Sequence, residues 1–292
     1  MLACLVLWGC SASGEEEKRP GADAEEKQEA GIDTEETQEG GADTLEVLFL
    51  KCGKADAIVL SCGGKTMVID AGEEDDGAKL IRAVKKTGAD HVDVLVITHF
   101  DKDHVGGADA LLKEMTVDRI CLPAYEGAGT DYDEFMALIS RDGRAPLYLK
   151  EDETFSLGDA SVLIEPPASY EIRNSRKEYD NDFSLITTVT HGENRLVFMG
   201  DAEKERTLEW LAAGRDRTCD LIKVPHHGVY HKAMKDLARA AGAGFAVITD
   251  SDKNPADEKT LKVFEESGSR IFSTRGGSIR AVSDGKSLEI SQ

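Results

Sequence analysis

The chain lacks paired cysteines and an excess of basic residues. Its six cysteines form no Cys-x-x-Cys pair, which argues against a thiolate zinc knuckle and a thioredoxin-like motif. The 35 Lys and Arg residues are outnumbered by 56 Asp and Glu, so the net charge is −21. Such a charge repels phosphate backbones at long range and argues against broad nucleic-acid binding. It does not exclude a nuclease, because bound divalent cations would reverse the local sign.

The N-terminus has no apolar run long enough to span a membrane. Leu2–Trp8 is mostly apolar but far shorter than the roughly 20 residues that cross a bilayer, and it fits the core of a signal peptide. Leu7-Trp8-Gly9-Cys10 resembles a bacterial lipobox, in which Cys10 would carry a lipid, although Trp8 is bulky and no Lys or Arg precedes the run. We therefore expect residues 1–14 to be a signal or lipobox-like segment of an extracytoplasmic, membrane-anchored bacterial lipoprotein. A chance apolar start is the alternative.

Residues 15–44 repeat a ten-residue acidic pattern, GADAEEKQEA and then GIDTEETQEG. With almost nothing to bury, this segment cannot offset the entropy cost of ordering, so we expect a disordered acidic linker. From residue 45 the pattern changes to short β-runs with turn signals, and residues 45–292 are expected to form one domain. Cys52 and Cys62 end neighbouring predicted strands, and we expect two small buried residues rather than a disulfide.

Strands interleaved with helices over residues 45–292 predict an α/β layered domain. The Val92–Thr98 run is almost continuously apolar, as in a strand that is covered on both faces. Further strands are expected at Leu45–Leu50, Ala57–Ser61, Thr66–Ile69, Ser161–Ile164, Leu185–Val189, Arg195–Met199, Leu221–Val224, Phe245–Ile248 and Arg270–Ser273. Helices are expected at Gly77–Lys86 and near Ala108–Glu114, Tyr132–Ile139, Glu203–Ala213, Lys232–Ala241 and Glu258–Glu266.

The main chemical signal directly follows the apolar strand. His99, Asp101, Asp103 and His104 have the spacing His-x-Asp-x-Asp-His, and Gly106-Gly107 comes next. A tight turn after a strand would hold these four donor side chains around two adjacent metals, and the glycines would let the backbone pass close beneath the site. The alternative is a charged surface turn that happens to contain two histidines. The apolar strand, the paired glycines and the downstream motifs favour the metal site.

With these motifs the chain resembles the metallo-β-lactamase superfamily, and within it the soluble hydrolase domain of ComEC-like competence proteins. That group has His-x-Asp-x-Asp-His where His-x-His-x-Asp-His is commoner. The other matching segments are Leu48–Ala57, Val68–Gly72, Asn181–Leu185, Phe198–Asp201 and Lys223–Gly228. The resemblance covers about residues 46–285 and implies the four-layer αββα sandwich of this superfamily.

The resemblance also implies two divalent metal ions, Zn or Mn, and a set of ligands for them. His99 and Asp101 would bind one metal, and Asp103 and His104 would bind the other. Asp201 would bridge both. Because this set is rich in carboxylates, Mn²⁺ is plausible beside Zn²⁺.

Four further residues have roles implied by the resemblance. One of His226 and His227, with His226 preferred, would complete the coordination of the second metal. Asn181 would approach the first metal, and Asp70 would orient a ligand from behind. The residues expected to act in catalysis are Asp103, Asp201 and His226.

The expected function is exported, metal-dependent hydrolysis by a hydroxide that two metals activate, on a phosphodiester of nucleic acid or of a cell-wall polymer. Val229 and Asn254 replace residues that relatives place near substrate oxygens, which puts DNA in doubt more than hydrolysis. Two alternatives stay open: a small carbonyl substrate, such as a lactone, thioester or β-lactam, and a non-catalytic surface-binding lipoprotein. No protein partner can be inferred. His91, His191 and His231 are expected to be ordinary exposed residues.

Overall fold

The structure is a computed structural model that describes residues 43–171 and 180–292. The predicted signal-like segment, and the linker except for its last two residues, lie outside the described residues. Within the described ranges, no helix has the length and apolar character needed to cross a membrane.

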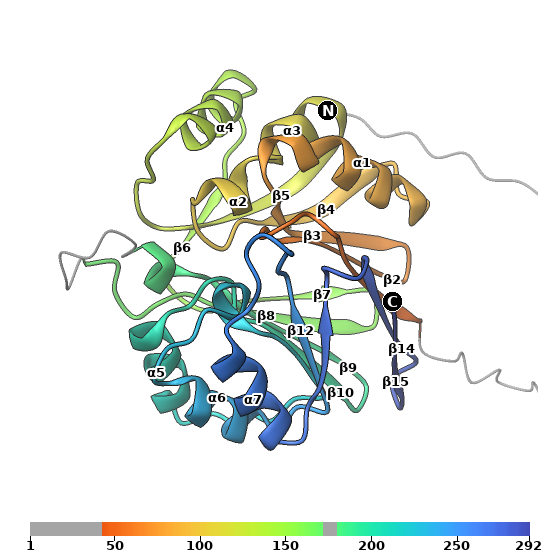
Figure 1. The fold of residues 1–292 in the computed structure, drawn as a ribbon. Coiled ribbons are helices and arrows are strands. Elements are labelled where there is room, and N and C mark those ends of the chain that lie inside the picture. The colour runs from red at the N-terminus through yellow and green to blue at the C-terminus, as the bar shows by residue number, and fades with distance from the viewer. Residues whose placement is uncertain (1–42, 172–179) are drawn as a thin grey trace, which may run out of the picture. The chain divides into compact units, whose positions relative to one another are not determined.

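Two mixed β-sheets form the centre of the fold (Figure 1). The eight-stranded sheet has the order β15-β14-β1-β2-β3-β4-β5-β6 and the seven-stranded sheet the order β13-β12-β11-β10-β9-β8-β7. The first sheet consists of β1 (Leu45–Phe49), β2 (Ala57–Cys62), β3 (Lys65–Ala71), β4 (His91–Val96), β5 (Thr116–Pro123), β6 (Leu147–Leu149), β14 (Ile279–Ser283) and β15 (Leu288–Ser291). The second consists of β7 (Glu153–Leu157), β8 (Ala160–Glu165), β9 (Ile186–His191), β10 (Asn194–Phe198), β11 (Leu221–Lys223), β12 (Phe245–Ile248) and β13 (Arg270–Ser273).

Helices cover the outer face of each sheet, as Figure 1 shows. Those beside the eight-stranded sheet are α1 (Gly77–Lys86), α2 (Lys102–Val105), α3 (Ala108–Glu114) and α4 (Thr130–Arg141). Those beside the seven-stranded sheet are α5 (Lys204–Ala212), α6 (Met234–Ala241) and α7 (Glu258–Glu266). Short 3₁₀ turns occur at Glu74–Asp76, Asp180–Phe183 and Pro225–Gly228.

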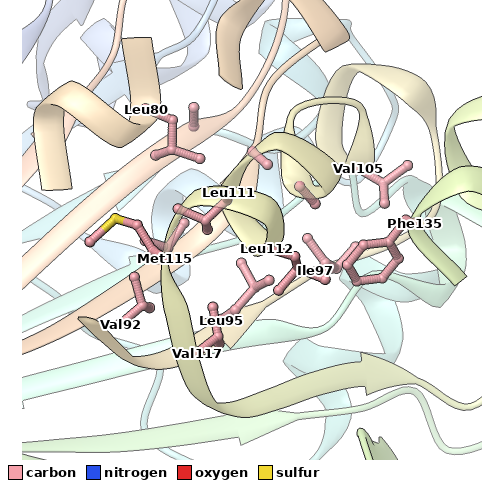
Figure 2. Packing of buried hydrophobic residues seen from close by; sticks show 14 of the residues in the cluster. Leu80, Val92, Leu95, Ile97, Val105, Leu111, Leu112, Met115, Val117 and Phe135 are labelled. Carbon is pink, nitrogen blue, oxygen red and sulfur yellow. The ribbon is translucent and has the colours of Figure 1, made fainter. Parts of the chain in front are cut away.

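Three buried apolar clusters lie between these four layers. One fills the space between the first sheet and its helices, where Leu111 and Phe135 pack toward Leu95 and Ile97 (Figure 2). A second lies between the sheets, and a third lies under α5–α7. The predicted four-layer αββα sandwich is therefore confirmed.

Strand β4 shows how the sequence pattern produces this layering. Val92 and Leu95 belong to the helix-side cluster, whereas Val94 and Val96 belong to the cluster between the sheets. Because the strand is covered on both faces, its sequence is nearly continuously apolar, as predicted.

The cysteines follow the same layering. Cys52 lies in the helix-side cluster and Cys62 lies between the sheets, and both are free and buried. The expectation of two small buried residues is confirmed.

The parallel strands of both sheets bring several chain segments to one edge. β3 is parallel to β4 in the first sheet, and β10, β11 and β12 are mutually parallel in the second. Asp70 lies at the end of β3, and Thr98 and His99 follow β4. Asp201 follows β10, and the Pro225–Gly228 turn follows β11. Side chains far apart in the sequence thus meet at this edge.

Candidate metal centre

The segment after β4 turns sharply and continues as the short helix α2. Asp101 is extended (φ −65°, ψ 145°), and its carbonyl accepts a hydrogen bond from the His104 backbone N–H at 2.9 Å. The turn lies directly against the end of β3. A Cβ atom added to Gly107 would lie 2.4 Å from the Ala71 carbonyl oxygen, which no real side chain tolerates. Gly107 therefore lets the backbone pass beneath the site, as the sequence predicted for the paired glycines.

Four buried polar atoms converge beyond this turn, and none has a hydrogen-bond partner among the described residues. They are Nε2 of His99, His104 and His227, and Oδ1 of Asp201. Oδ1 of Asp201 lies 3.3 Å from Nε2 of His104, and Oδ2 lies 3.1 Å from Nε2 of His227. Imidazole nitrogens and carboxylate oxygens are ligands of divalent cations. The set therefore fits metal ions.

The ligand atoms form two overlapping groups. His99, His104 and Asp201 make one group, and Asp103, His104 and His227 make the other, each with its atoms within 4.8 Å of one another. Oδ2 of Asp103 lies 3.5 Å from Nε2 of His227. Because the two groups share His104, they lie next to each other.

Asp101 lies at the edge of this arrangement. Its Oδ2 is 3.7 Å from Nε2 of His99, and its side chain is 37% exposed while that of His99 is fully buried. His99 and Asp101, which are expected to serve the same metal, thus lie side by side.

The two consecutive histidines, of which His226 was the preferred ligand, face the cluster differently. His227 is 1% exposed, and its Nε2 faces Asp103 and Asp201. His226 is 8% exposed; its Nε2 is 3.9 Å from Oδ2 of Asp201, and its Nδ1 is 3.7 Å from Oε1 of Glu203. The geometry therefore favours His227 as the ligand and puts His226 at the mouth of the site. The reason is the turn itself, in which both residues have positive φ angles of 48° and 50° and the planes of their rings lie 66° apart.

Hydrogen bonds behind the cluster set the orientation of two imidazoles. Asp70 accepts hydrogen bonds from Thr98 N and Thr98 Oγ1 at 2.7 Å each, and its Oδ2 lies 2.8 Å from Nδ1 of His104. Nδ1 of His227 lies 3.0 Å from the Thr249 carbonyl oxygen. A ring that donates through Nδ1 presents Nε2 as a free lone pair, which is the usual arrangement of a histidine ligand. Asp70, which is expected to orient a ligand from behind, thus contacts the His104 ring.

The charges of the cluster stabilise one another strongly. Burial alone would lower the pKa of His104, but the Asp201 and Asp70 carboxylates outweigh it and raise the pKa well above its usual range. Burial alone would raise the pKa of Asp201, but His227 and His104 outweigh it and hold the pKa well below its usual range. The carboxylates therefore stay ionised, as metal ligands must be, and a metal bound at His104 would displace its proton.

Comparison with known proteins identifies the family. Residues 50–248 match the family model described as the metallo-beta-lactamase superfamily. The chain belongs to this superfamily.

Its curated relatives are much longer proteins. The chain is 23% identical over 198 residues to ComE operon protein 3 of Bacillus subtilis, a match that covers 67% of this chain and 25% of the relative. It is 24% identical over 211 residues to Recombination protein 2 of Haemophilus influenzae, covering 70% of this chain and 24% of the relative. The chain therefore spans about a quarter of the length of the curated relatives it matches.

A solved structure shows the same fold. The metallo-beta-lactamase fold protein YhfI of Bacillus subtilis superposes with a TM-score of 0.56 at 12% sequence identity, covering 85% of this chain and 100% of the other. The fold and the superfamily imply divalent metals, for which the histidine and aspartate groups are the candidate ligands.

The turn at Asp180–Phe183 closes another side of this metallo-beta-lactamase site. Asn181 is 1% exposed and its Oδ1 has no hydrogen-bond partner among the described residues. Beside it, burial and the nearby Asp101 carboxylate raise the pKa of Asp180 to about 6. The sequence analysis named Asn181 but missed Asp180. The only signal for Asp180 was its place directly before the Asn181–Leu185 motif.

Two further residues were missed as parts of the site. Asp56 and Lys223 are both fully buried and form an ion pair next to Asp201. Each lies in a segment that matched the family pattern, but the two segments are far apart in the sequence, and nothing in either indicates that these residues make contact.

The remaining histidines differ from expectation in part. His191 was expected to be exposed but is completely buried, with its Nδ1 2.9 Å from Ser283 Oγ, because the strand end that carries it packs against β14. Both ring nitrogens of His231 are also buried. His91 is partly exposed at the opposite end of β4, where its Nε2 lies 3.6 Å from both Asp93 and Asp118.

Proposed function

We propose that this chain is a metal-dependent hydrolase that cleaves a phosphodiester with the help of two divalent metal ions. The observation that carries the proposal is the convergence of four buried ligand atoms, from His99, His104, His227 and Asp201, on one edge of the sandwich. Buried imidazole nitrogens that face one shared carboxylate are the donor set of a divalent-metal site.

The donor set supports the following arrangement of ligands. His99 and Asp101, with Asp201, would hold one metal, and Asp103, His104 and His227 would hold the other. The bound metals would supply an activated water and would polarise the bond under attack. Zn²⁺ fits the histidine nitrogens, and Mn²⁺ is compatible with the three carboxylates.

Side chains at the mouth would bind and orient the substrate. His226 lies there beside Glu203, 3.9 Å from the Asp201 carboxylate. An imidazole in this position can donate a hydrogen bond or a proton to the leaving oxygen. A depression of about 390 Å³ extends from the carboxylates along Phe100 and Tyr132, which leaves room for the substrate on the outer side of the turn.

Phosphodiester chemistry is favoured by the family resemblance and by the name of one relative. Recombination protein 2 is named for a process that acts on DNA. Against nucleic acid stand the net charge of −21 and the exposed Val229 at the turn after His227. A cell-wall phosphodiester therefore remains within the proposal together with nucleic acid.

The test combines metal analysis with two chromogenic substrates. The purified chain should contain about two equivalents of Zn or Mn, and Asp103→Ala should lose at least one of them. The parent should cleave bis-p-nitrophenyl phosphate, and the variant should not. Two metals with cleavage of p-nitrophenyl acetate alone would favour a carbonyl substrate. Absence of metal after reconstitution would contradict the hydrolase proposal.

We also propose that the protein is exported and anchored by a lipid at Cys10. The support is the lipobox-like Leu7-Trp8-Gly9-Cys10 together with the acidic repeat that follows. Metabolic labelling with a palmitate analogue should label the parent, and Cys10→Ala should abolish the label. Equal labelling of both proteins would contradict the anchor.

A further inference from the structure

A buried ion pair joins the two sheets directly behind the candidate metal centre. Asp56 precedes β2 of the eight-stranded sheet, and Lys223 ends β11 of the seven-stranded sheet. Both side chains are at most 1% exposed, and Nζ of Lys223 contacts Oδ2 of Asp56. We propose that this pair is a positioning device that holds the ligands of the two sheets at the spacing the metals require. The inference rests on the proposed metal centre.

The backbone of Asp56 fixes the ligands that come from the first sheet. Its N–H donates a hydrogen bond of 3.0 Å to the carbonyl oxygen of Asp103, and its own carbonyl accepts one of 2.7 Å from Gly72. The Gly72 carbonyl in turn accepts a hydrogen bond from Gly107. A shift of Asp56 would therefore move the turn that carries Asp103 and His104.

The carboxylate of Asp56 acts on the late histidine through one intermediate residue. Its Oδ1 accepts a 2.6 Å hydrogen bond from Thr249 Oγ1. The carbonyl and hydroxyl oxygens of Thr249 lie 3.0 and 3.1 Å from Nδ1 of His227. This contact directs Nε2 of His227 toward Asp103 and Asp201. Asp56 thus links a ligand from each sheet.

The ammonium group of Lys223 acts on the bridging carboxylate. Nζ donates a 3.0 Å hydrogen bond to the carbonyl of Gly200, the residue before Asp201, and lies 3.6 Å from Oδ1 of Asp201. The backbone turns here through a positive φ of 54° at Gly200. Lys223 therefore fixes the start of the Asp201 loop. Its charge also reduces the repulsion between Asp56 and Asp201, which would otherwise push the two carboxylates apart.

A positioning role and a general stabilising role of the pair predict different effects of its replacement on metal binding. Buried ion pairs are weak contributors to stability, because desolvation offsets their attraction, and uncharged replacements of both partners are often tolerated. A pair that only supports the fold could then be replaced without effect on metal binding. A pair that positions ligands could not, because loss of a residue behind a ligand weakens metal binding about 10–100-fold.

The experiment uses the full chain with Asp56→Asn and Lys223→Met combined. The matched control combines Glu165→Gln and Arg217→Met, which removes another buried ion pair of 2.8 Å whose side chains are each 6% exposed. Zn²⁺ affinity is measured by chelator competition, the visible spectrum of the Co²⁺-loaded protein reports ligand geometry, and thermal melting of the metal-stripped protein reports fold stability.

We expect the Asp56/Lys223 variant to bind Zn²⁺ about 10–100-fold more weakly, with an altered Co²⁺ spectrum, and the control to bind like the parent. If the first variant does not fold, Thr249→Val removes the hydrogen bond to Asp56 without burying a charge, and it should weaken Zn²⁺ binding several-fold. Parent-like affinity in the variant that folds would overturn the inference and leave the proposed function standing. Absence of metal from the parent would overturn both.

Discussion

Asp70 holds His104 through a 2.8 Å contact between its Oδ2 and Nδ1 of the imidazole, while its backbone adopts a positive φ of 57°. Few residues other than glycine, asparagine and aspartate adopt that conformation readily. The strained backbone turns the carboxylate back toward Thr98 and His104 instead of along the strand. The position therefore has two requirements, a left-handed backbone and a buried anion.

Asp70→Asn separates these two requirements. Asparagine tolerates the left-handed backbone, so the fold should persist, but the charge that orients His104 is lost. We expect Zn²⁺ affinity to fall about 10–100-fold in a chelator competition. Asp109→Asn is the control, because Asp109 is also buried but pairs with Lys113 on α3. An Asp70→Asn affinity equal to that of the control would contradict the orienting role.

The consecutive histidines should respond differently to substitution. His227→Ala removes a group that faces Asp103 and Asp201, so we expect elemental analysis to show the loss of about one metal equivalent. His226→Ala should keep both metals and lower the hydrolysis rate about 100-fold, because its side chain lies at the mouth. Loss of metal from the His226 variant with retention in the His227 variant would reverse the assignment.

Much of the fold could be predicted from local pattern, since periodicity is written in neighbouring residues. The helix at Gly77–Lys86 and the strand at Phe245–Ile248 were predicted with the bounds observed. Strand β5 was missed because Asp118 and Arg119 interrupt its apolar run. The hairpin of β14 and β15 was missed because it lies at the sheet edge, where only three of its nine residues are buried.

The site was predictable only where its residues are close in sequence or match a motif. The turn from His99 to His104 carries four donors within six positions and is visible in the sequence alone. Asp56 and Thr249 are 193 positions apart in the sequence. They meet only because Asp56 precedes β2 and Thr249 follows β12 at the same edge of the sandwich. The choice between His226 and His227 depends on two left-handed backbone angles, which no spacing rule contains.

Gly107 should not tolerate any side chain. Its φ of −83° suits alanine, so the cost of Gly107→Ala is steric, from a Cβ that would lie 2.4 Å from the Ala71 oxygen. We expect a loss of about 1–3 kcal/mol in the free energy of unfolding, measured by urea titration. Gly244→Ala is the control, because the nearest atom to its Cβ would be 3.8 Å away. Equal stability of the two variants would show that the turn can move away from β3.

We expect the buried His231 to lower the free energy of unfolding in mildly acidic solution. Burial lowers its pKa from 6.5 to about 4, so the unfolded chain takes up a proton in a range where the folded protein does not. Its contribution to stability is therefore complete above pH 6.5 and is lost as the pH falls from 6.5 to about 4, by up to about 3 kcal/mol.

The comparison that isolates this effect is between the parent and His231→Gln in urea unfolding at a series of pH values, with a chelator present. The variant cannot titrate at this position, so its stability should fall less steeply over the same range. His91→Gln should keep the steep fall, because neighbouring Asp90 raises the pKa of His91 and gives it the opposite dependence on pH. Identical slopes for the parent and His231→Gln would mean that the ring is hydrated in the folded protein, so that burial does not suppress its protonation.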